Sequence, residues 1–380
     1  MKKNRLCIFV FLLAGLATPA LAQNATPVET AAKQAFIIDA NTGTVLYAKE
    51  AEAPMPTSSM SKMMTMYMVF DALKSGKLKM TDMLPTSERA WKQEGSRMFL
   101  NVGQEASVED LIRGVAVQSG NDAAVSLAEA LGSGSEYTFA DMMNAKAKEL
   151  GMANSHFMNA TGLPDAQHYA SPHDLAILAL ALIRDFPEHY HYFSEREFTY
   201  NKIKQGNRNP LLYRNMNVDG LKTGHAEEAG YGLTVSAVRS GWRLVMVLNG
   251  LKNMQNRADE SARLLDWAYR EFGLYPVARA GEKITEAQVW LGEEKTVPLT
   301  VGQNVEFTLP RNARPGLKAV MNFDQPIPAP ITKGQEIGKL TVTAPGMEAK
   351  ELPLLAGADV PRLGFFARLG VKLRALFGRE

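Results

Sequence analysis

The spacing of hydrophobic and polar residues divides the chain into two parts of different texture. Over residues 35–275, short alternating runs typical of strands mix with stretches in which apolar residues recur every three or four positions, as in helices. Over residues 276–353 only short alternating runs remain, and Pro and Gly residues separate them. The pattern therefore predicts a mixed domain followed by a small all-β domain, with the boundary after Tyr275.

Two hairpins and several helices can be placed in the first part. The hairpins are expected over 35–49 and 231–249, the second around Ser240-Gly241. Helices are expected over 57–73, 108–118, 122–131 and 172–182. Ser107 followed by Asp110 predicts a capping box for the second of these helices.

The first 22 residues have the pattern of a cleaved secretory signal. A basic start with Lys2, Lys3 and Arg5 precedes an apolar run and a small-residue site ending at Ala22. The run is shorter than the roughly 20 apolar residues that a membrane-spanning helix needs. We therefore expect an exported protein that begins near Gln23, with a retained anchor as the alternative.

The last residues, 359–380, predict an amphipathic helix. Large apolar residues occupy one arc of a helical wheel and basic residues the other: Leu363, Phe365, Phe366, Leu369, Leu373, Leu376 and Phe377 against Arg368, Lys372 and Arg379. This pattern is typical of a helix that lies in the surface of a membrane containing anionic lipid. Docking into the groove of a partner protein is the alternative.

Composition narrows the class of protein. The chain has 380 residues, 46% of them hydrophobic and 22% charged, with a net charge of +2. These values are typical of a soluble globular protein of two or three domains and disfavour a nucleic-acid binder. The one cysteine, Cys7, lies in the predicted signal. The mature chain therefore has no cysteine nucleophile, disulfide or thiolate metal site.

Candidate chemistry concentrates in three short segments. Ser59 and Lys62 are three residues apart near a helix start, so both side chains project from one face. A serine hydroxyl needs a base to become a nucleophile, and a lysine amine kept neutral by burial or by a nearby cation can serve.

The other two segments would complete a site around this pair. Ser119-Gly120-Asn121 lies between two predicted helices, where Ser119 can relay a proton and Asn121 can hold the lysine and a substrate amide. Lys222-Thr223-Gly224-His225 leads into a strand. There Lys222 and Thr223 can bind a carboxylate, and Gly224 can let a substrate lie against the strand edge.

Together the three segments resemble the S-x-x-K, S-D-N and K-T-G motifs of the penicillin-recognising serine enzymes. The surrounding residues are most similar to the D-alanyl-D-alanine carboxypeptidases among the low-molecular-mass penicillin-binding proteins. The resemblance covers the signal, the first domain, the β-rich domain and the tail. It implies an α+β fold: a β-lactamase/transpeptidase-like catalytic domain over 23–275, with an antiparallel sheet flanked by helices, then an all-β domain over 276–358 and the tail helix.

The resemblance also implies the chemistry. An enzyme of this kind removes the terminal D-alanine of a peptidoglycan stem peptide through an acyl-enzyme and is acylated by β-lactam antibiotics. Ser59 would be the nucleophile, Lys62 the proton acceptor, Ser119 the relay and Asn121 the orienting amide. Lys222 would bind substrate and keep Lys62 neutral. The N–H groups of Ser59 and His225 would form the oxyanion hole, and Arg257 would lie near the substrate carboxylate. No cofactor or metal is implied.

Alternatives remain open at this stage. A β-lactamase or a D,D-endopeptidase of the same superfamily, or a penicillin-binding scaffold with little turnover, would carry the same motifs. Glu197 and Asn201 resemble the deacylating E-x-x-x-N pattern of class A β-lactamases but come too late in the chain. The residues Met55, Met60, Met63, Met64, Met66 and Met68 are interpreted as core, and His168, His173, His189 and His191 as structural or surface histidines rather than metal ligands.

Overall fold

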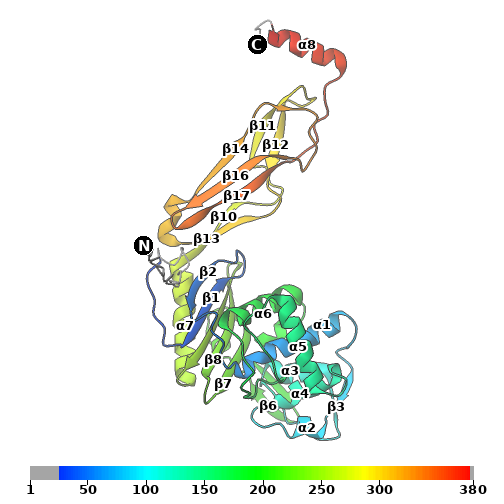
Figure 1. The fold of residues 1–380 in the computed structure, drawn as a ribbon, viewed down its shortest axis with the longest axis vertical. Coiled ribbons are helices and arrows are strands. Elements are labelled where there is room, and N and C mark those ends of the chain that lie inside the picture. Colours follow the sequence, from blue (N-terminus) through cyan, green and yellow to red (C-terminus); the bar gives the residue numbers. More distant parts are fainter. Residues whose placement is uncertain (1–24, 377–380) are drawn as a thin grey trace, which may run out of the picture.

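The structure is a computed structural model that describes residues 25–376. The predicted signal over 1–22 with Cys7, the side chains of Lys372, Leu373 and Leu376, and the residues Phe377 and Arg379 lie outside its described part. The described chain is elongated, with the mixed domain at one end, the β domain stacked above it and a helix at the far end (Figure 1).

An antiparallel five-stranded sheet organises the mixed domain. Its strand order is β2-β1-β9-β8-β7, so β7 lies at an edge. The strands are β1 (Gln34–Asp39), β2 (Val45–Lys49), β7 (Val218–Ala226), β8 (Gly230–Arg239) and β9 (Trp242–Leu251). Both predicted hairpins are confirmed. Ser240 and Gly241 both have positive φ, as the two-residue turn between β8 and β9 requires.

Alternation along the strands buries the two faces of this sheet under different helices. Phe36 and Ile38 of β1 face one core cluster, while Ile37 faces the other. The first cluster includes α1 (Lys62–Lys74) and α6 (Pro172–Asp185), and the second is covered by α7 (Met254–Glu271). The six methionines expected in the core are all buried, five of them in the first turn and helix that follow Pro56. Two hydrophobic layers therefore sandwich the sheet.

The remaining elements of this domain are short or lie beside the first core. They are α2 (Glu88–Trp91), α3 (Val108–Ala116), α4 (Asn121–Leu131) and α5 (Glu136–Leu150), the 3-10 turns η2 (Ser58–Ser61), η3 (Tyr190–Ser194) and η4 (Pro210–Tyr213), and two small ribbons, β3 (Met83–Pro85) with β4 (Glu105–Ser107) and β5 (Glu197–Tyr200) with β6 (Ile203–Gly206). The Ser107 cap is confirmed, since its Oγ accepts from the Asp110 N–H at 3.1 Å and donates to the Asp110 carboxylate at 2.7 Å. The helix expected over 57–73 instead begins as η2.

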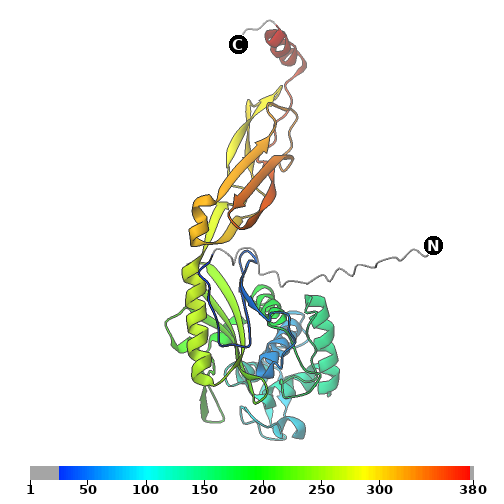
Figure 2. The same ribbon diagram turned by 60° about the vertical axis from the view of Figure 1, so that its left-hand side comes forward.

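The second domain is all-β, as predicted. A six-stranded sheet has the order β14-β16-β17-β12-β11-β15, and β10 pairs with β13 beside it. Its strands are β10 (Phe272–Ala278), β11 (Thr285–Trp290), β12 (Thr296–Thr300), β13 (Val305–Pro310), β14 (Lys318–Phe323), β15 (Ile327–Pro328), β16 (Glu336–Ala344) and β17 (Met347–Ala356). Strand β10 follows α7 without a linker and runs through the expected boundary at Tyr275, which ties the two domains closely (Figure 2).

The tail forms helix α8 (Phe365–Leu376), at the end of the molecule farthest from the mixed domain (Figure 1). Phe365, Phe366 and Leu369 are 67%, 85% and 50% exposed. The apolar arc is therefore open along the described part of this helix.

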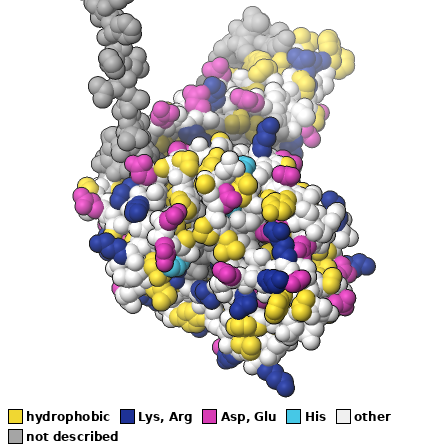
Figure 3. All heavy atoms as spheres, turned by 60° about the horizontal axis from the view of Figure 1, so that its bottom comes forward, with side chains coloured by type: hydrophobic (Ala, Val, Ile, Leu, Met, Phe, Trp, Pro, Cys, Tyr) yellow, Lys and Arg dark blue, Asp and Glu magenta, His cyan; other side chains and the backbone are white. Residues whose placement is uncertain are grey.

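On the far end of the mixed domain, acidic and basic side chains are intermixed (Figure 3).

The two domains meet through a buried carboxylate. Asp39, at the end of β1, is fully buried and accepts from the Asn41 N–H at 2.7 Å and from the Thr42 hydroxyl at 3.0 Å. Thr308 of β13 donates its hydroxyl to the same carboxylate. Arg311 of the β domain donates to the carbonyl oxygens of Tyr269 and Arg270 in α7. The junction is thus a polar, hydrogen-bonded contact.

We expect Thr308→Val to weaken this junction, because it leaves a buried carboxylate with one hydrogen bond fewer. The cost should be about 1–3 kcal/mol of unfolding free energy, measured by urea denaturation. Thr308→Ser keeps the hydroxyl and serves as the matched control. Equal stability of the valine and serine variants would show that the contact does not hold the domains together.

Candidate active site

Ser59 and Lys62 meet at the turn from η2 into α1. The Lys62 side chain is fully buried, and its Nζ lies 2.9 Å from Ser59 Oγ and donates to the carbonyl oxygen of Thr161 at 2.6 Å. The carbonyl of Thr161 can keep its hydrogen bond when the amine is neutral, which leaves the nitrogen lone pair for the serine proton. The distance is that of a nucleophile and its base.

The environment of Lys62 favours the neutral amine. Burial lowers its pKa to about 7, and the positive charge of Arg208 contributes in the same direction. The carboxylates of Asp122 and Glu136 oppose both effects. Near neutral pH a large fraction of this lysine is therefore unprotonated, which an exposed lysine would not be.

Ser119 and Lys222 form a second pair. Ser119 lies between α3 and α4 with a positive φ of 64°, and the buried Lys222 of β7 donates to its Oγ at 2.8 Å. Burial and the nearby Lys62, Arg208 and Arg257 hold the pKa of Lys222 well below its usual value. Lys62 and Lys222 thus repel each other when both are charged, and Arg208 lowers the pKa of both amines.

Asn121 is the first residue of α4. Its Nδ2 donates to the carbonyl oxygen of Glu94 at 2.6 Å, and its Oδ1 is buried with no partner within the described chain. The expected hydrogen bond to the lysine does not form among these residues. The amide oxygen is left unpaired at the wall of the pocket described below.

Gly224 is explained by packing within the protein. A Cβ atom there would lie 2.7 Å from the carbonyl oxygen of Thr57, so β7 can approach η2 this closely only at a glycine. We expected the glycine to make room for substrate, and the structure adds this protein contact. The neighbouring His225 is exposed, and its ring stacks on Tyr231 with centroids 3.9 Å apart.

Two arginines lie at one end of the site. Arg257, in the first turn of α7, is 6% exposed, and burial lowers its pKa to about 10. Its guanidinium lies over Tyr231, 5.6 Å from the ring centroid, and its Nε has no partner in the described structure. Arg208 was missed by the sequence analysis. It lies in a loop before η4 and belongs to none of the motifs.

All these groups converge on one pocket of about 500 Å³, which we call the serine pocket. Its walls include Ser59, Ser119, Asn121, Thr223, Gly224, His225, Arg208 and Arg257. Lys62 and Lys222 lie buried beneath it, in contact with Ser59 and Ser119. The structure therefore brings the three sequence segments and Arg257 to a single site.

A buried histidine supports the serine turn. His168 Nδ1 accepts from the Met158 N–H at 3.1 Å, so Nε2 carries the proton and donates to Ser61 Oγ at 2.6 Å. Burial lowers the pKa of His168 to about 4, which keeps the ring neutral. The hydroxyl of Ser61 also forms a hydrogen bond with the hydroxyl of Thr57. This histidine is structural, as interpreted, but it acts on the segment that carries Ser59.

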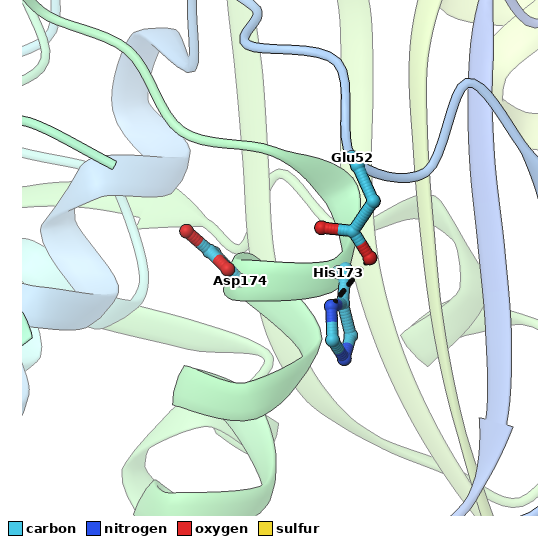
Figure 4. A group of neighbouring side chains, drawn as sticks. All are labelled: Glu52, His173 and Asp174. Carbon is cyan, nitrogen blue, oxygen red and sulfur yellow. Dashed lines mark ion pairs between the residues drawn. The ribbon is translucent and has the colours of Figure 1, made fainter. Parts of the chain in front are cut away.

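The side chains of Glu52, His173 and Asp174 each place one possible ligand atom within 4.8 Å of the others. Glu52 and His173 form an ion pair at 2.7 Å, while Asp174 points away from them (Figure 4). The Asp174 carboxylate accepts from the Asn154 N–H and the Ser155 hydroxyl, both at 2.7 Å. The side chains of this cluster therefore already make ionic contacts or hydrogen bonds within the protein. Glu197 likewise forms a surface ion pair with Lys204 at 2.7 Å.

Over residues 25–376, no helix combines the length and the apolar character needed to cross a bilayer.

Comparison with known proteins identifies the family of both domains. The family model for D-alanyl-D-alanine carboxypeptidases matches residues 21–253, and the model for the C-terminal domain of penicillin-binding protein 5 matches residues 272–362. The chain is 39% identical to D-alanyl-D-alanine carboxypeptidase DacA of Haemophilus influenzae, covering 90% of this chain and 89% of the relative. It is 36% identical to DacA of Escherichia coli K12, covering 91% and 88%.

Solved structures give the same result. The crystal structure of penicillin-binding protein 5 from Haemophilus influenzae superposes with a TM-score of 0.78 at 39% identity, covering 89% of this chain and 99% of that chain. A variant of a Streptomyces K15 DD-transpeptidase covers 64% of this chain and 100% of its own, with a TM-score of 0.60 at 25% identity. The predicted fold class is therefore confirmed. From its sequence, its two domains and its fold, the chain belongs to the D-alanyl-D-alanine carboxypeptidase family.

Proposed function

We propose that the chain removes the terminal D-alanine from peptidoglycan stem pentapeptides through an acyl-enzyme on Ser59. One observation carries this assignment: the buried Lys62 amine, with a pKa of about 7, lies 2.9 Å from Ser59 Oγ at the floor of the serine pocket. Family membership supports the substrate, and β-lactam antibiotics would acylate the same serine.

In the proposed acylation, Lys62 is the base and Ser119 the proton relay. Neutral Lys62 takes the Ser59 proton while Oγ attacks the carbonyl carbon of the penultimate D-alanine. The N–H groups of Ser59 and His225 stabilise the oxyanion. The peptide C–N bond then breaks, and the leaving D-alanine amine receives a proton through Ser119. Water attacks the ester, and the proton it loses restores the serine hydroxyl.

The arginine end of the pocket would give specificity for the C-terminal residue of the peptide. Arg257, Lys222 and Thr223 would bind the terminal carboxylate, and Arg208 adds a second guanidinium at the same wall. Lys222 has a lowered pKa in the free protein, so an arriving carboxylate would favour its protonation. Asn121 Oδ1, which is unpaired, would accept from the substrate amide N–H.

The exported form is proposed to act on the periplasmic side of the cytoplasmic membrane. The apolar face of α8 is exposed at Phe365, Phe366 and Leu369. It can bury in the headgroup boundary while basic residues of the tail meet anionic lipid, each contact being worth about 1 kcal/mol. The protein would then be peripheral, with α8 as its membrane contact.

Ser59→Ala should abolish both D-alanine release and labelling by a fluorescent penicillin, a loss of more than about 10³-fold. The reason is that, within residues 25–376, Ser59 supplies the one hydroxyl that is hydrogen-bonded to Lys62. Ser75→Ala, at the other end of α1, is the control and should be labelled like the wild type. Labelling of Ser59→Ala at the wild-type rate would refute the nucleophile, whereas acylation of the wild type without D-alanine release would indicate a penicillin-binding scaffold.

Acylation should weaken as the pH falls through about 7, because Lys62 becomes protonated there and cannot accept the serine proton. Arg208→Gln removes a positive charge that lowers the Lys62 pKa, so the acid limb of the pH profile should move to higher pH. Stopped-flow acylation by a penicillin from pH 5 to 9 measures both. Lys62→Arg should be nearly inactive throughout. An unshifted limb in Arg208→Gln would contradict the electrostatic role of Arg208.

A chain that ends at Leu363 should leave the membrane fraction yet keep its activity on small peptides. It retains the Val360 and Leu363 N–H donors to the β domain, at 2.8 and 2.9 Å, and loses only α8 with the residues beside it. Sedimentation with vesicles containing anionic lipid measures the first effect, and D-alanine release the second. Full retention of the shortened chain in the membrane fraction would place the anchor elsewhere.

A further inference from the structure

The contact between the two domains leaves two hollows, of about 570 and 560 Å³. Each hollow takes its walls from both domains, and both are lined by Asn41 of the β1–β2 turn and Glu306 of β13. These shared walls place the hollows next to each other, where β2 and β13 approach in Figure 1. We call the pair the junction groove. A chain-like ligand can reach from one hollow into the other.

The walls of the junction groove combine aromatic rings with amide and hydroxyl groups. Trp242 and Tyr275 line the first hollow, and Phe307 lines the second. The neutral polar residues of the second hollow are Asn41, Thr42, Thr44, Gln303 and Asn304. Gln303 and Asn304 are exposed, so a ligand has access to their amides. Such a mixture can hold a ligand that has both apolar faces and hydrogen-bonding groups.

The charges of the groove nearly balance. Arg239, in the first hollow, forms an ion pair with a carboxylate of α7 at 2.6 Å, and Arg311 donates to carbonyl oxygens at the end of that helix. Lys350 lines the second hollow together with the carboxylates of Glu306 and Glu348. Since neither sign of charge dominates and the arginines already have partners, the groove favours an uncharged polar ligand over a phosphate or a polyanion.

A buried indole on the groove wall also points to a ligand. Trp242 is 7% exposed, and its Nε1–H is buried with no hydrogen-bond partner within the described chain. A buried tryptophan N–H is usually hydrogen-bonded. The neighbouring Tyr269 has a partner, because its hydroxyl donates to the carbonyl oxygen of Ala237 at 2.7 Å. An oxygen atom of a ligand in the first hollow, met by a small shift of the indole, would satisfy the Trp242 N–H.

We propose that the junction groove binds a glycan strand of N-acetylated hexosamines. Each sugar of such a strand has an apolar C–H face that can lie on an aromatic ring, and hydroxyl and acetamide groups that pair with amides and with the Trp242 N–H. The groove shares no wall residue with the serine pocket. The inference therefore goes beyond the proposed function: the protein would hold the sugar polymer as well as the peptide attached to it.

Helix α7 sets the separation of the two sites. Arg257, in its first turn, lines the serine pocket, and Tyr269, in its last turn, lines the junction groove. At about 1.5 Å per residue the two lie about 18 Å apart along the helix axis. An extended pentapeptide has a similar length, about 17 Å. A strand in the groove would therefore leave Ser59 free and could present an attached stem peptide to it.

Binding is tested by isothermal titration calorimetry of the chain from Gln23 with tetra-N-acetylchitotetraose. The wild type should bind this tetrasaccharide. Glu306→Ala changes the wall that both hollows share, and Trp242→Phe removes the N–H but keeps an aromatic ring. Each should weaken binding by about three- to tenfold, the effect expected for one lost hydrogen bond.

Two matched controls lie outside the groove in the β domain. Glu336→Ala on β16 makes the same change in charge, and Trp290→Phe on β11 makes the same change of ring. Both should bind like the wild type. No binding by the wild type at millimolar saccharide, or wild-type affinity in both Glu306→Ala and Trp242→Phe, would overturn the inference. If one of these two variants does not fold, the other decides.

Acylation of Ser59 by a penicillin before the titration should leave the affinity for the tetrasaccharide unchanged, because the sites are separate. Loss of binding after acylation would place the saccharide in the serine pocket and overturn the inference.

A second experiment compares D-alanine release from a free pentapeptide and from the same peptide attached to a tetrasaccharide. The attached peptide should have the lower KM at the same kcat, and Glu306→Ala should remove the difference. Equal KM values in the wild type would overturn the link between the groove and the substrate. If the proposed function failed, neither peptide would release D-alanine, whereas calorimetry would still detect the bound saccharide.

Discussion

A lysine amine buried beside a serine hydroxyl is the constraint on which this structure depends. An ammonium group is costly to bury, so the site is stable with a neutral Lys62, and that neutral amine is the base that Ser59 needs. Burial of Lys62 is thus unfavourable for the charged amine, but it also keeps the amine neutral and able to act as a base. Arg208 strengthens the effect from the pocket wall, where its guanidinium can also meet an anion.

The surrounding elements hold this arrangement by close contact rather than by a large number of charged pairs. A Cβ at Gly162 would lie 1.9 Å from the Ser58 carbonyl oxygen, and one at Gly224 would lie 2.7 Å from that of Thr57. The loop at Gly162 and the edge strand β7 therefore pack closely against the serine turn on two sides. His168 fixes it from below through Ser61, and Thr161 orients the amine. A small displacement of the loop at Gly162 or of β7 would therefore also move Ser59.

The sequence predicted the parts of the molecule that follow from local pattern. The hairpins, the Ser107 cap and the methionine-rich core depend on periodicity and turn chemistry, and the motif residues could be placed through their resemblance to a family. Arg208, and the contact through which His168 supports the serine turn, could not be identified in this way, because both depend on long-range packing of loops without a distinctive pattern. The role of Gly224 was incomplete for the same reason: the approach of Thr57 to β7 exists only in the folded chain. The sequence pattern also did not indicate that the first helix starts as η2, whose Ser58 carbonyl packs against Gly162.

The buried contact of Asp39 with Thr308 has a consequence for the reach of the enzyme. A flexible linker would let the pocket sample a wide volume, with an effective concentration that falls as the linker lengthens. Here the mixed domain and the β domain are joined by hydrogen bonds and by the continuous α7–β10 connection. Helix α8 lies at the far end of the β domain (Figures 1 and 2). With α8 on a membrane, as proposed, the serine pocket would be confined to a thin layer at a nearly fixed height. The length of the β domain would then set the height above the membrane at which the enzyme acts on the cell wall.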